Sequence, residues 1–229
     1  MSAKPLRLPH GMRSLYEDRD LIVIDKPSGL LTIAAGGERE RTAYWLLCEA
    51  LRQRGEKRRV AVVHRLDRDT SGVLVFAKSD EAKRALMDNW DTAVVERMYV
   101  ALVEGAFPET EGRIDAPLGE DRSGRVIVVQ AGIPAATRWR VIETGNGYTL
   151  LELNLETGRR NQIRAHLDWL GRPVTGDKKY SSRSDPIGRL ALHAQRLVLH
   201  HPFDGRLLEF DVPPPPDFRR ALGNKQGRR

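Results

Sequence analysis

The sequence predicts an α+β fold, because strand-like and helix-like patterns occur along the same chain. Short apolar runs rich in β-branched residues and bounded by turn residues are typical of buried strands, as at 20–25 and 73–77. The stretch 42–52 instead places its apolar residues at helical spacing on one face, with Thr42 as a suitable N-cap. Ser79 is expected to cap a further helix that runs to about Trp90. Residues 108–125 look like loop and turn. Gly145-Asn146-Gly147 separates two further strand-like runs and favours a hairpin.

The size and charge of the chain narrow the class of protein. The 229 residues suit one large domain or two packed halves, and 40% hydrophobic residues suffice for a core. The formal net charge of +7 favours a polyanionic partner, most often nucleic acid. A basic protein without such a partner would have the same charge, so this alternative stays open.

The cysteine count excludes two kinds of site. Cys48 is the one cysteine, so neither an intrachain disulfide framework nor a cysteine-rich zinc site can form. This usage fits a reducing compartment, and we expect the protein to be cytoplasmic. Residues 1–20 contain no apolar signal-peptide region, and no apolar run has the length of a membrane span, so we expect no membrane partner.

The most distinctive stretch is HRLDRDTSG at 64–72, which joins strand-like runs at 60–63 and 73–77. A polar loop held between two buried strands is a rigid mount for a reactive group. Asp67 has Arg65 and Arg68 close in sequence. Cations near a carboxylate favour its ionised form, which suits a nucleophile or an electrostatic stabiliser.

Two other interpretations of this loop stay open from the residues alone. It could be a salt-bridged turn in which Asp67 and Asp69 only cap the backbone. The same pair of carboxylates could instead serve a metal-dependent nuclease or phosphoesterase. His193, His200 and His201 are the other candidate metal ligands, but no carboxylate lies at ligand-like spacing on one face with them, so we expect no metal.

The loop is similar to the HRLDxxTSG signature of the RluA-type RNA pseudouridine synthases. Four further stretches resemble motifs of that family, in the family's order: the KPxG turn at 26–29, the KxYxAxVxG strand at 97–105, TGRxHQIRxHL at 157–167 and PxxGDxxY at 173–180. Arg97 stands where lysine is usual, and Asn161 replaces the usual histidine. The resemblance runs from Asp20 to Phe218, nearly the whole chain.

This resemblance implies a mixed, largely antiparallel central sheet with flanking helices and an RNA-binding active-site cleft. It also implies isomerisation of specific uridines to pseudouridine in structured RNA, which is ribosomal RNA, transfer RNA or both. The reaction is redox-neutral, so we expect no cofactor. The competing hypothesis is a catalytically silent RNA-binding protein on the same scaffold.

The resemblance also suggests how the chain is organised. We expect a loose basic arm at 1–14, the catalytic domain at 15–218, and a basic, disordered tail at 219–229. About twenty residues precede the first expected strand, too few for the N-terminal S4 domain that many family members carry. A compact member of the family is therefore expected, and a monomer is the default expectation for its oligomeric state.

The resemblance assigns roles to individual residues. Asp67 would be the catalytic carboxylate, which attacks either the ribose or the base or assists the departure of uracil, and Arg164 would pair with it. Tyr99 would stack on the flipped uracil and help to remove the C5 proton. The remaining RNA-contacting residues would be Arg65, which fills the place of the flipped base, and His64, Arg68, Thr70, Ile163, Arg159 and Arg160. The basic run 52–59 would contact phosphates.

Overall fold

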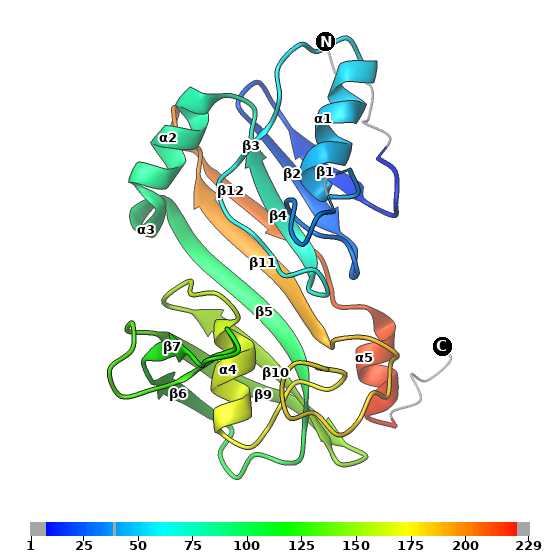
Figure 1. Ribbon diagram of the computed structural model, residues 1–229, viewed down its shortest axis with the longest axis vertical. Coiled ribbons are helices and arrows are strands. Elements are labelled where there is room, and N and C mark those ends of the chain that lie inside the picture. Colours follow the sequence, from blue (N-terminus) through cyan, green and yellow to red (C-terminus); the bar gives the residue numbers. More distant parts are fainter. Residues whose placement is uncertain (1–7, 39, 224–229) are drawn as a thin grey trace. The chain divides into compact units, whose positions relative to one another are not determined.

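The computed structural model describes residues 8–38 and 40–223, which form two compact units. The first unit comprises Met1–Glu96 and Ala194–Val212, and the second comprises Arg97–His193 and Pro213–Arg229. Strands β5 (Val94–Glu104) and β11 (Leu192–His200) each carry residues of both units. The domain expected at 15–218 therefore extends over both units. In Figure 1 the chain is coloured by residue number, so the segments of each unit can be followed.

The first unit is built on a sheet in which β1, β2, β4 and β11 are neighbours in that order. Strand β3 also pairs with β4, and β12 pairs with β11. The bounds are β1 Arg13–Glu17, β2 Leu21–Lys26, β3 Ala61–Val62, β4 Ser71–Ala77 and β12 Leu207–Asp211. Every residue of β4 is buried, as expected for a central strand that reads as a continuous apolar run.

Three helices of the first unit follow from their caps and apolar stripes. They are α1 (Ala43–Gln53), α2 (Asp80–Asp88) and α3 (Trp90–Ala93). The hydroxyl of Thr42 accepts a hydrogen bond from the backbone N–H of Trp45, and that of Ser79 accepts one from Ala82. Both N-caps are confirmed. Helix α2 buries Ala82 and Leu86 against the apolar side chains of β2, β4, β11 and β12.

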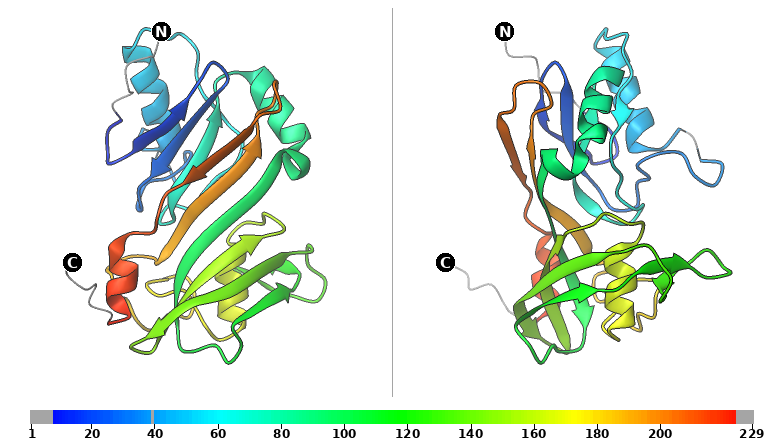
Figure 2. Two further views of the ribbon diagram at one scale, coloured as in Figure 1. Left: turned by 180° about the vertical axis from the view of Figure 1, so that it is seen from behind. Right: turned by 90° about the vertical axis from the view of Figure 1, so that its left-hand side faces the viewer.

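The second unit contains the antiparallel strands β5, β10, β9 and β6, in that order. Their bounds are β6 Glu111–Asp115, β9 Ala136–Gly145 and β10 Tyr148–Leu155. A separate hairpin pairs β7 (Leu118–Glu120) with β8 (Val126–Val128). Helices α4 (Gln162–Trp169) and α5 (Pro216–Ala221) complete the unit, and the views of Figure 2 show α4 beside the sheet.

The predicted α+β class and the largely antiparallel pairing are confirmed. The predicted hairpin is confirmed too: Asn146 and Gly147 both take positive φ, 51° and 78°, between β9 and β10. Strands β6 and β7 lie in 108–125, a stretch expected to be loop. The sequence of β6, EGRID, buries only Ile114, so its apolar pattern is too weak to predict a strand.

The chain ends differ in part from expectation. Strand β1 begins at Arg13, inside the expected arm 1–14, and α5 includes Arg219 and Arg220 of the expected tail. Residues 1–7 of that arm and 224–229 of that tail lie outside the described residues. In the described part of the chain, every helix is too short or too polar to cross a membrane.

Gly72 explains why the loop at 64–72 ends in glycine. Its φ is +112°, and a Cβ atom at this position would lie 2.1 Å from the carbonyl oxygen of Ala194. Such a distance is far below van der Waals contact, and the obstacle is backbone rather than a movable side chain. Only glycine therefore lets β4 begin this close to the backbone of β11.

We predict that Gly72→Ala lowers the free energy of unfolding by about 3 kcal/mol, about 1 from the positive φ and about 2 from the steric overlap. Gly205→Ala is the matched control, because Gly205 also has positive φ (+69°) but has open space around its Cβ direction. The control should cost only about 1 kcal/mol. Urea unfolding of both variants checks this, and equal losses would contradict the steric argument.

Candidate active site

The turn at 26–29 and the loop at 64–72 meet because of strand pairing in the first unit. Strand β2 pairs antiparallel with β4, and Lys26 at the end of β2 lies opposite Gly72 near the start of β4. The segment that follows β2 and the segment that precedes β4 therefore leave the sheet at the same end of the two strands. Two stretches singled out in the sequence thus become spatial neighbours.

Lys26 is fully buried, with 0% of its surface exposed. Its ammonium group donates hydrogen bonds to the backbone carbonyls of Pro27 (3.0 Å), Leu30 (2.7 Å) and Arg68 (3.0 Å). Burying an ammonium group is costly unless its three N–H groups find acceptors, and these carbonyls supply them. Because Arg68 directly follows Asp67, Lys26 fixes the backbone on one side of that carboxylate.

Two hydroxyl groups hold the same loop. The Thr32 hydroxyl donates to the carbonyl of Leu66 (2.8 Å) and accepts from the backbone N–H of Leu66 (3.2 Å). The Ser28 hydroxyl donates to the carbonyl of Asp69 (2.7 Å). The backbone is therefore bound on both sides of Asp67, which is the rigidity that a catalytic carboxylate needs.

The side chains of the loop differ in exposure. Asp67 is half-buried, whereas Arg65 and Arg68 are exposed. Arg68 donates to the carboxylate of Glu38 at 2.7 Å, so its charge is already paired in this structure. Thr70 is buried, and its backbone N–H donates to the carbonyl of Asp67 (3.3 Å), closing a turn around the carboxylate.

His64 has a structural partner on each side. Its Nε2 atom accepts a hydrogen bond from the backbone N–H of Val75 (3.1 Å), and its ring lies 5.2 Å from that of Trp90. Accepting at Nε2 requires a neutral ring with that nitrogen deprotonated. These contacts join the start of the loop to β4 and α3.

In the second unit, Gln162 shapes the turn that opens α4. Its side-chain oxygen accepts from the Thr157 hydroxyl (2.8 Å) and the Arg159 backbone N–H (2.9 Å). Its side-chain nitrogen donates to the carbonyl of Ala136 (2.9 Å) and the hydroxyl of Thr137 (3.0 Å). The amide is buried and all four of its hydrogen-bonding positions are used, so it holds the turn in one conformation.

Asn161, which replaces the histidine usual in the motif, takes the left-handed backbone conformation just before α4, with φ 52°. Asparagine tolerates this conformation better than most residues. The departure from the family motif is therefore compatible with the turn. The following residue, Gln162, begins the helix.

Arg164 and Asp177 form a bidentate ion pair. The Nε and Nη2 atoms of Arg164 donate to the two carboxylate oxygens of Asp177 at 2.6 and 2.7 Å. The Asp177 side chain is fully buried and also accepts from the backbone N–H groups of Lys179 and Tyr180. The pair uses the Nε and Nη2 atoms of the guanidinium and fixes the plane of the group.

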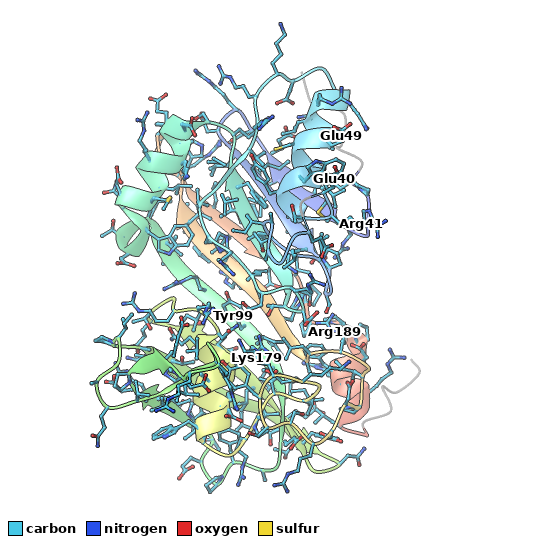
Figure 3. All side chains as sticks on the ribbon, in the orientation of Figure 1. Glu40, Arg41, Glu49, Tyr99, Lys179 and Arg189 are labelled. Carbon is cyan, nitrogen blue, oxygen red and sulfur yellow. The ribbon has the colours of Figure 1, made fainter. Side chains whose placement is uncertain are left out.

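Tyr99 and Ile163 belong to one apolar region of the second unit. Ile163 is buried in its core cluster, and Tyr99 packs against the same cluster from β5, where Figure 3 labels it. Arg97, two residues before Tyr99, has its Nη1 atom 2.4 Å from where a Cβ atom on Gly158 would lie. Glycine at 158 thus makes room for the arginine that stands in place of the usual lysine.

The two arginines expected to bind phosphate are engaged within the second unit. Arg159 donates through Nε to the carbonyl of Pro134 (3.2 Å). Arg160 donates to the carbonyl of Gly124 and pairs with Glu120, both at 2.9 Å. The Arg160 side chain remains 44% exposed, so it can still meet a ligand.

The basic run at 52–59 divides into paired and unpaired members. Arg52 pairs with Glu49, and Arg54 pairs with Glu17 and Glu56. Lys57 and Arg58 are exposed and form no ion pair with any other residue that the structure describes. Exposed, unpaired cations are the members of such a run best placed to contact phosphates.

One histidine does face carboxylates. The Nε2 atom of His201 lies 3.2 Å from Asp18 and 3.8 Å from Asp20, and its Nδ1 atom lies 3.1 Å from Asp204. Asp18, Asp20 and His201 could hold a metal ion. The expectation that no carboxylate accompanies these histidines is therefore wrong for His201. Asp18 and Asp20 come from a turn far away in the sequence, and Asp204 lies three residues further along the chain.

Asp18 is already well supplied with donors. It accepts from the Tyr16 hydroxyl, from Arg206 at 2.7 Å, and from the backbone N–H groups of Asp20 and Leu21. Burial and Asp18 together raise the pKa of Tyr16 to about 12, so this hydroxyl keeps its proton. The cluster is thus a dense ion-pair network that joins the β1–β2 turn to the β11–β12 turn.

Three residues that hold the Asp67 loop or Arg164 in place were not predicted from the sequence. Lys26 and Thr32 were not assigned to the Asp67 loop, and Asp177 was not assigned to Arg164. Both Lys26 and Asp177 lie within the stretches that resemble family motifs, which is the one signal that could have found them. Their geometric roles depend on contacts between segments distant in sequence.

Comparison with known proteins identifies the family. A family model described as RNA pseudouridylate synthase matches residues 20–169. The chain belongs to the RNA pseudouridylate synthase family. The family predicted from the sequence motifs is therefore confirmed.

Relatives from bacteria and a human structure agree with this family. An uncharacterized RNA pseudouridine synthase of Chloroflexus aurantiacus is 44% identical, over 89% of this chain and 66% of the relative. Ribosomal large subunit pseudouridine synthase D of Nitrosomonas europaea is 41% identical, over 92% of this chain and 64% of the relative. The chain thus spans about two thirds of the length of these relatives. Human RNA Pseudouridylate Synthase Domain Containing 1 is 25% identical, with a TM-score of 0.75 over 96% of this chain and 90% of that one.

His166 gives this family member a buried histidine beside the proposed site. Its Nδ1 atom accepts from the Thr137 hydroxyl (2.9 Å), and its Nε2–H donates to the carbonyl of Ala116 (3.0 Å). Since Thr137 itself accepts from Gln162, its hydroxyl proton is directed at the ring, which is neutral. Burial lowers the pKa of His166 from its usual value of 6.5.

We predict that acid destabilises the fold through His166. The unfolded chain protonates this ring near pH 6.5, while the folded protein keeps it neutral to lower pH. The stability that depends on neutral His166 is complete above the unfolded pKa and is lost as the pH falls toward the folded one. Urea unfolding from about pH 7.5 to about pH 5.5 should show this loss. It should be smaller in His166→Gln, and an unchanged slope would contradict the argument.

Proposed function

We propose that this protein isomerises uridine to pseudouridine in structured RNA, with Asp67 as the catalytic carboxylate. The observation that carries the proposal is Asp67 on a loop whose backbone is bound on both sides, in a chain of the pseudouridylate synthase family. The reaction breaks the bond between uracil N1 and ribose C1′ and joins C1′ to C5. The C5 proton leaves to solvent and N1 gains a proton, so atoms and charge balance without an oxidant.

Asp67 acts on the bond that breaks. Either it attacks the sugar or the base, or it stabilises the charge that develops at C1′ when uracil departs. Each route needs an ionised carboxylate at a fixed position. The bonds from Lys26 and Thr32 to its neighbours in the loop support that position.

Arg164 and Tyr99 complete the proposed machinery. The proposal requires these second-unit residues to act on the same uridine as Asp67. Arg164 pairs with Asp67 through the guanidinium edge that Asp177 does not occupy, and so orients the carboxylate. Tyr99 stacks on the uracil once it has left the RNA helix, and helps to remove the C5 proton.

The remaining residues bind RNA in this proposal. Arg65 is exposed next to Leu66 and can enter the stack where the uridine has left it. Exposed basic side chains contact phosphates and give the binding its salt dependence. These phosphate contacts come from Arg68, Arg159, Arg160, Lys57 and Arg58. His64 and Thr70, in the loop at 64–72, and Ile163, in the motif at 157–167, shape the uridine-binding pocket.

The proposed substrate is a stem-loop of ribosomal or transfer RNA. The name of the Nitrosomonas europaea relative refers to the large ribosomal subunit, which favours ribosomal RNA. We further propose that the protein acts as a monomer in the cytoplasm and without a metal. Tritium release in excess EDTA tests the last point.

The first test measures tritium release from ribosomal and transfer RNA labelled at uridine C5, because the label enters water only when C5 forms the new bond. Wild type should release tritium from one pool, and Asp67→Asn should release none above background. Asp69→Asn is the matched control, since Asp69 is an exposed carboxylate of the same loop. It should keep wild-type turnover.

Each outcome of this test decides between hypotheses. Wild-type turnover in Asp67→Asn would refute the catalytic role. Tight RNA binding without release by wild type would favour a catalytically silent binding protein. Loss of activity in both variants and in EDTA would instead favour metal-dependent chemistry at the two carboxylates.

We predict that Arg164→Lys lowers kcat by about 100-fold while changing KM little, because lysine keeps the charge but cannot pair bidentately. The retained charge also keeps buried Asp177 neutralised, so the variant should fold. Steady-state tritium release gives kcat and KM, and circular dichroism checks the fold. A folded variant with near-normal kcat would remove Arg164 from the site.

A further inference from the structure

The ring of Tyr180 packs against two guanidinium groups from different elements of the second unit. The Cζ atom of Arg164, on α4, lies 5.0 Å from the ring centroid, and that of Arg125, just before β8, lies 4.6 Å from it. Arginine stacks favourably on an aromatic ring at such distances. We call these three residues the Tyr180 stack.

Tyr180 is itself fixed to the β7–β8 hairpin. Its hydroxyl donates to the carbonyl of Val126 (2.9 Å), and Val126 directly follows Arg125. Its ring is 4% exposed. The hairpin thus holds the ring by a hydrogen bond at one end and by the guanidinium of Arg125.

Each guanidinium of the stack has its own carboxylate. Arg164 binds both oxygens of Asp177, and Arg125 donates through Nη2 to Asp168 at 2.6 Å. These partners offset the repulsion between two cations that share one ring. The ion pair with Asp177 restricts movement of the Arg164 guanidinium within the plane of the group. The ring of Tyr180 restricts its movement perpendicular to that plane.

Arg125 is a poor residue for stability alone. Its Nε atom is buried and has no hydrogen-bond partner among the described residues, which costs free energy. Its ion pair with Asp168 is mostly buried (the side chains are 28% and 16% exposed), so the cost of desolvating the two charges offsets much of their attraction. Asp168 also accepts from the backbone N–H of Ser181 (2.9 Å), so the carboxylate keeps a partner without Arg125.

We propose that Arg125 is a positioning residue for the isomerisation, which fixes the guanidinium of Arg164 through the ring of Tyr180. This inference rests on the proposed function and assigns a task to a residue outside every motif that the sequence pointed to. It also assigns a structural role to Tyr180, the tyrosine of the stretch that resembles PxxGDxxY. The β7–β8 hairpin thereby becomes part of the support for the reaction.

The first experiment compares Arg125→Met with wild type in steady-state tritium release from the RNA that wild type modifies. Methionine fills the space without the charge, the stacking plane or the orphaned Nε–H. We expect kcat to fall by at least about tenfold with KM changed by less than about threefold. Arg122→Met is the matched control, because it removes an exposed charge from the same hairpin turn. Its kcat should equal that of wild type.

A double-mutant cycle tests whether Arg125 acts through Tyr180. Tyr180→Leu removes the ring, and Tyr180→Phe keeps the ring but removes the hydroxyl. We expect Arg125→Met to cost little further kcat in the Tyr180→Leu background, because the ring is then already absent. Tyr180→Phe should keep more activity than Tyr180→Leu. Fully additive losses would overturn the proposal, as would a rise in KM with unchanged kcat, which would indicate direct RNA binding by Arg125.

A measurement without substrate separates this proposal from the proposed function. In ¹⁵N NMR spectra the Nε–H of Arg164, bonded to Asp177, should exchange slowly with water in wild type and Arg122→Met. It should exchange at least about tenfold faster in Arg125→Met if the stack restrains the guanidinium. Unchanged exchange would overturn the positioning role even if wild type isomerises uridine. Faster exchange in a protein that releases no tritium would refute only the proposed function.

Discussion

The burial of one ammonium group organises the loop that carries Asp67. Lys26 has no contact with water, so its charge depends on backbone carbonyls from its own turn and from Arg68, 42 residues away. If the loop moved, a buried cation would lose an acceptor, which costs far more than the loss of a surface contact. Movement of the backbone beside Asp67 is therefore opposed by the free-energy cost of leaving the ammonium group of Lys26 without a hydrogen-bond acceptor or of exposing it. Thr32 adds a second restraint at Leu66.

The second unit uses a continuous chain of polar groups for the same purpose. Gln162 donates to Thr137, Thr137 donates to His166, and His166 donates to the carbonyl of Ala116. Each member has one arrangement of protons that satisfies its neighbours, so the start of α4 has one orientation. Arg164 projects from this helix and is held by Asp177. In each unit, hydrogen bonds from buried polar groups thus make the backbone rigid where it carries the charged side chain.

The sequence predicted the elements whose patterns are local. The N-caps Thr42 and Ser79 and the hairpin near Asn146 were correct, since each depends on a few adjacent residues. The motif segments identified the family. Partners that come from distant segments could not be predicted: Arg54 pairs with Glu17 from 37 residues away, and no periodicity encodes that contact. Edge strand β6 was missed for a related reason, because its pairing with β9 rather than its own apolar pattern makes it a strand. The pairing of Asp67 with Arg164 stays a prediction.

The discontinuous first unit has a consequence for how the protein is made. Its core joins Leu21 and Val73 to Leu197 and Phe210, which leave the ribosome more than a hundred residues later. The core of the second unit likewise waits for Phe218 on α5. Neither unit can close around its apolar side chains until the last strand and helix have been synthesised. The nascent chain therefore carries exposed apolar strands through most of translation, and these are the surfaces that chaperones bind.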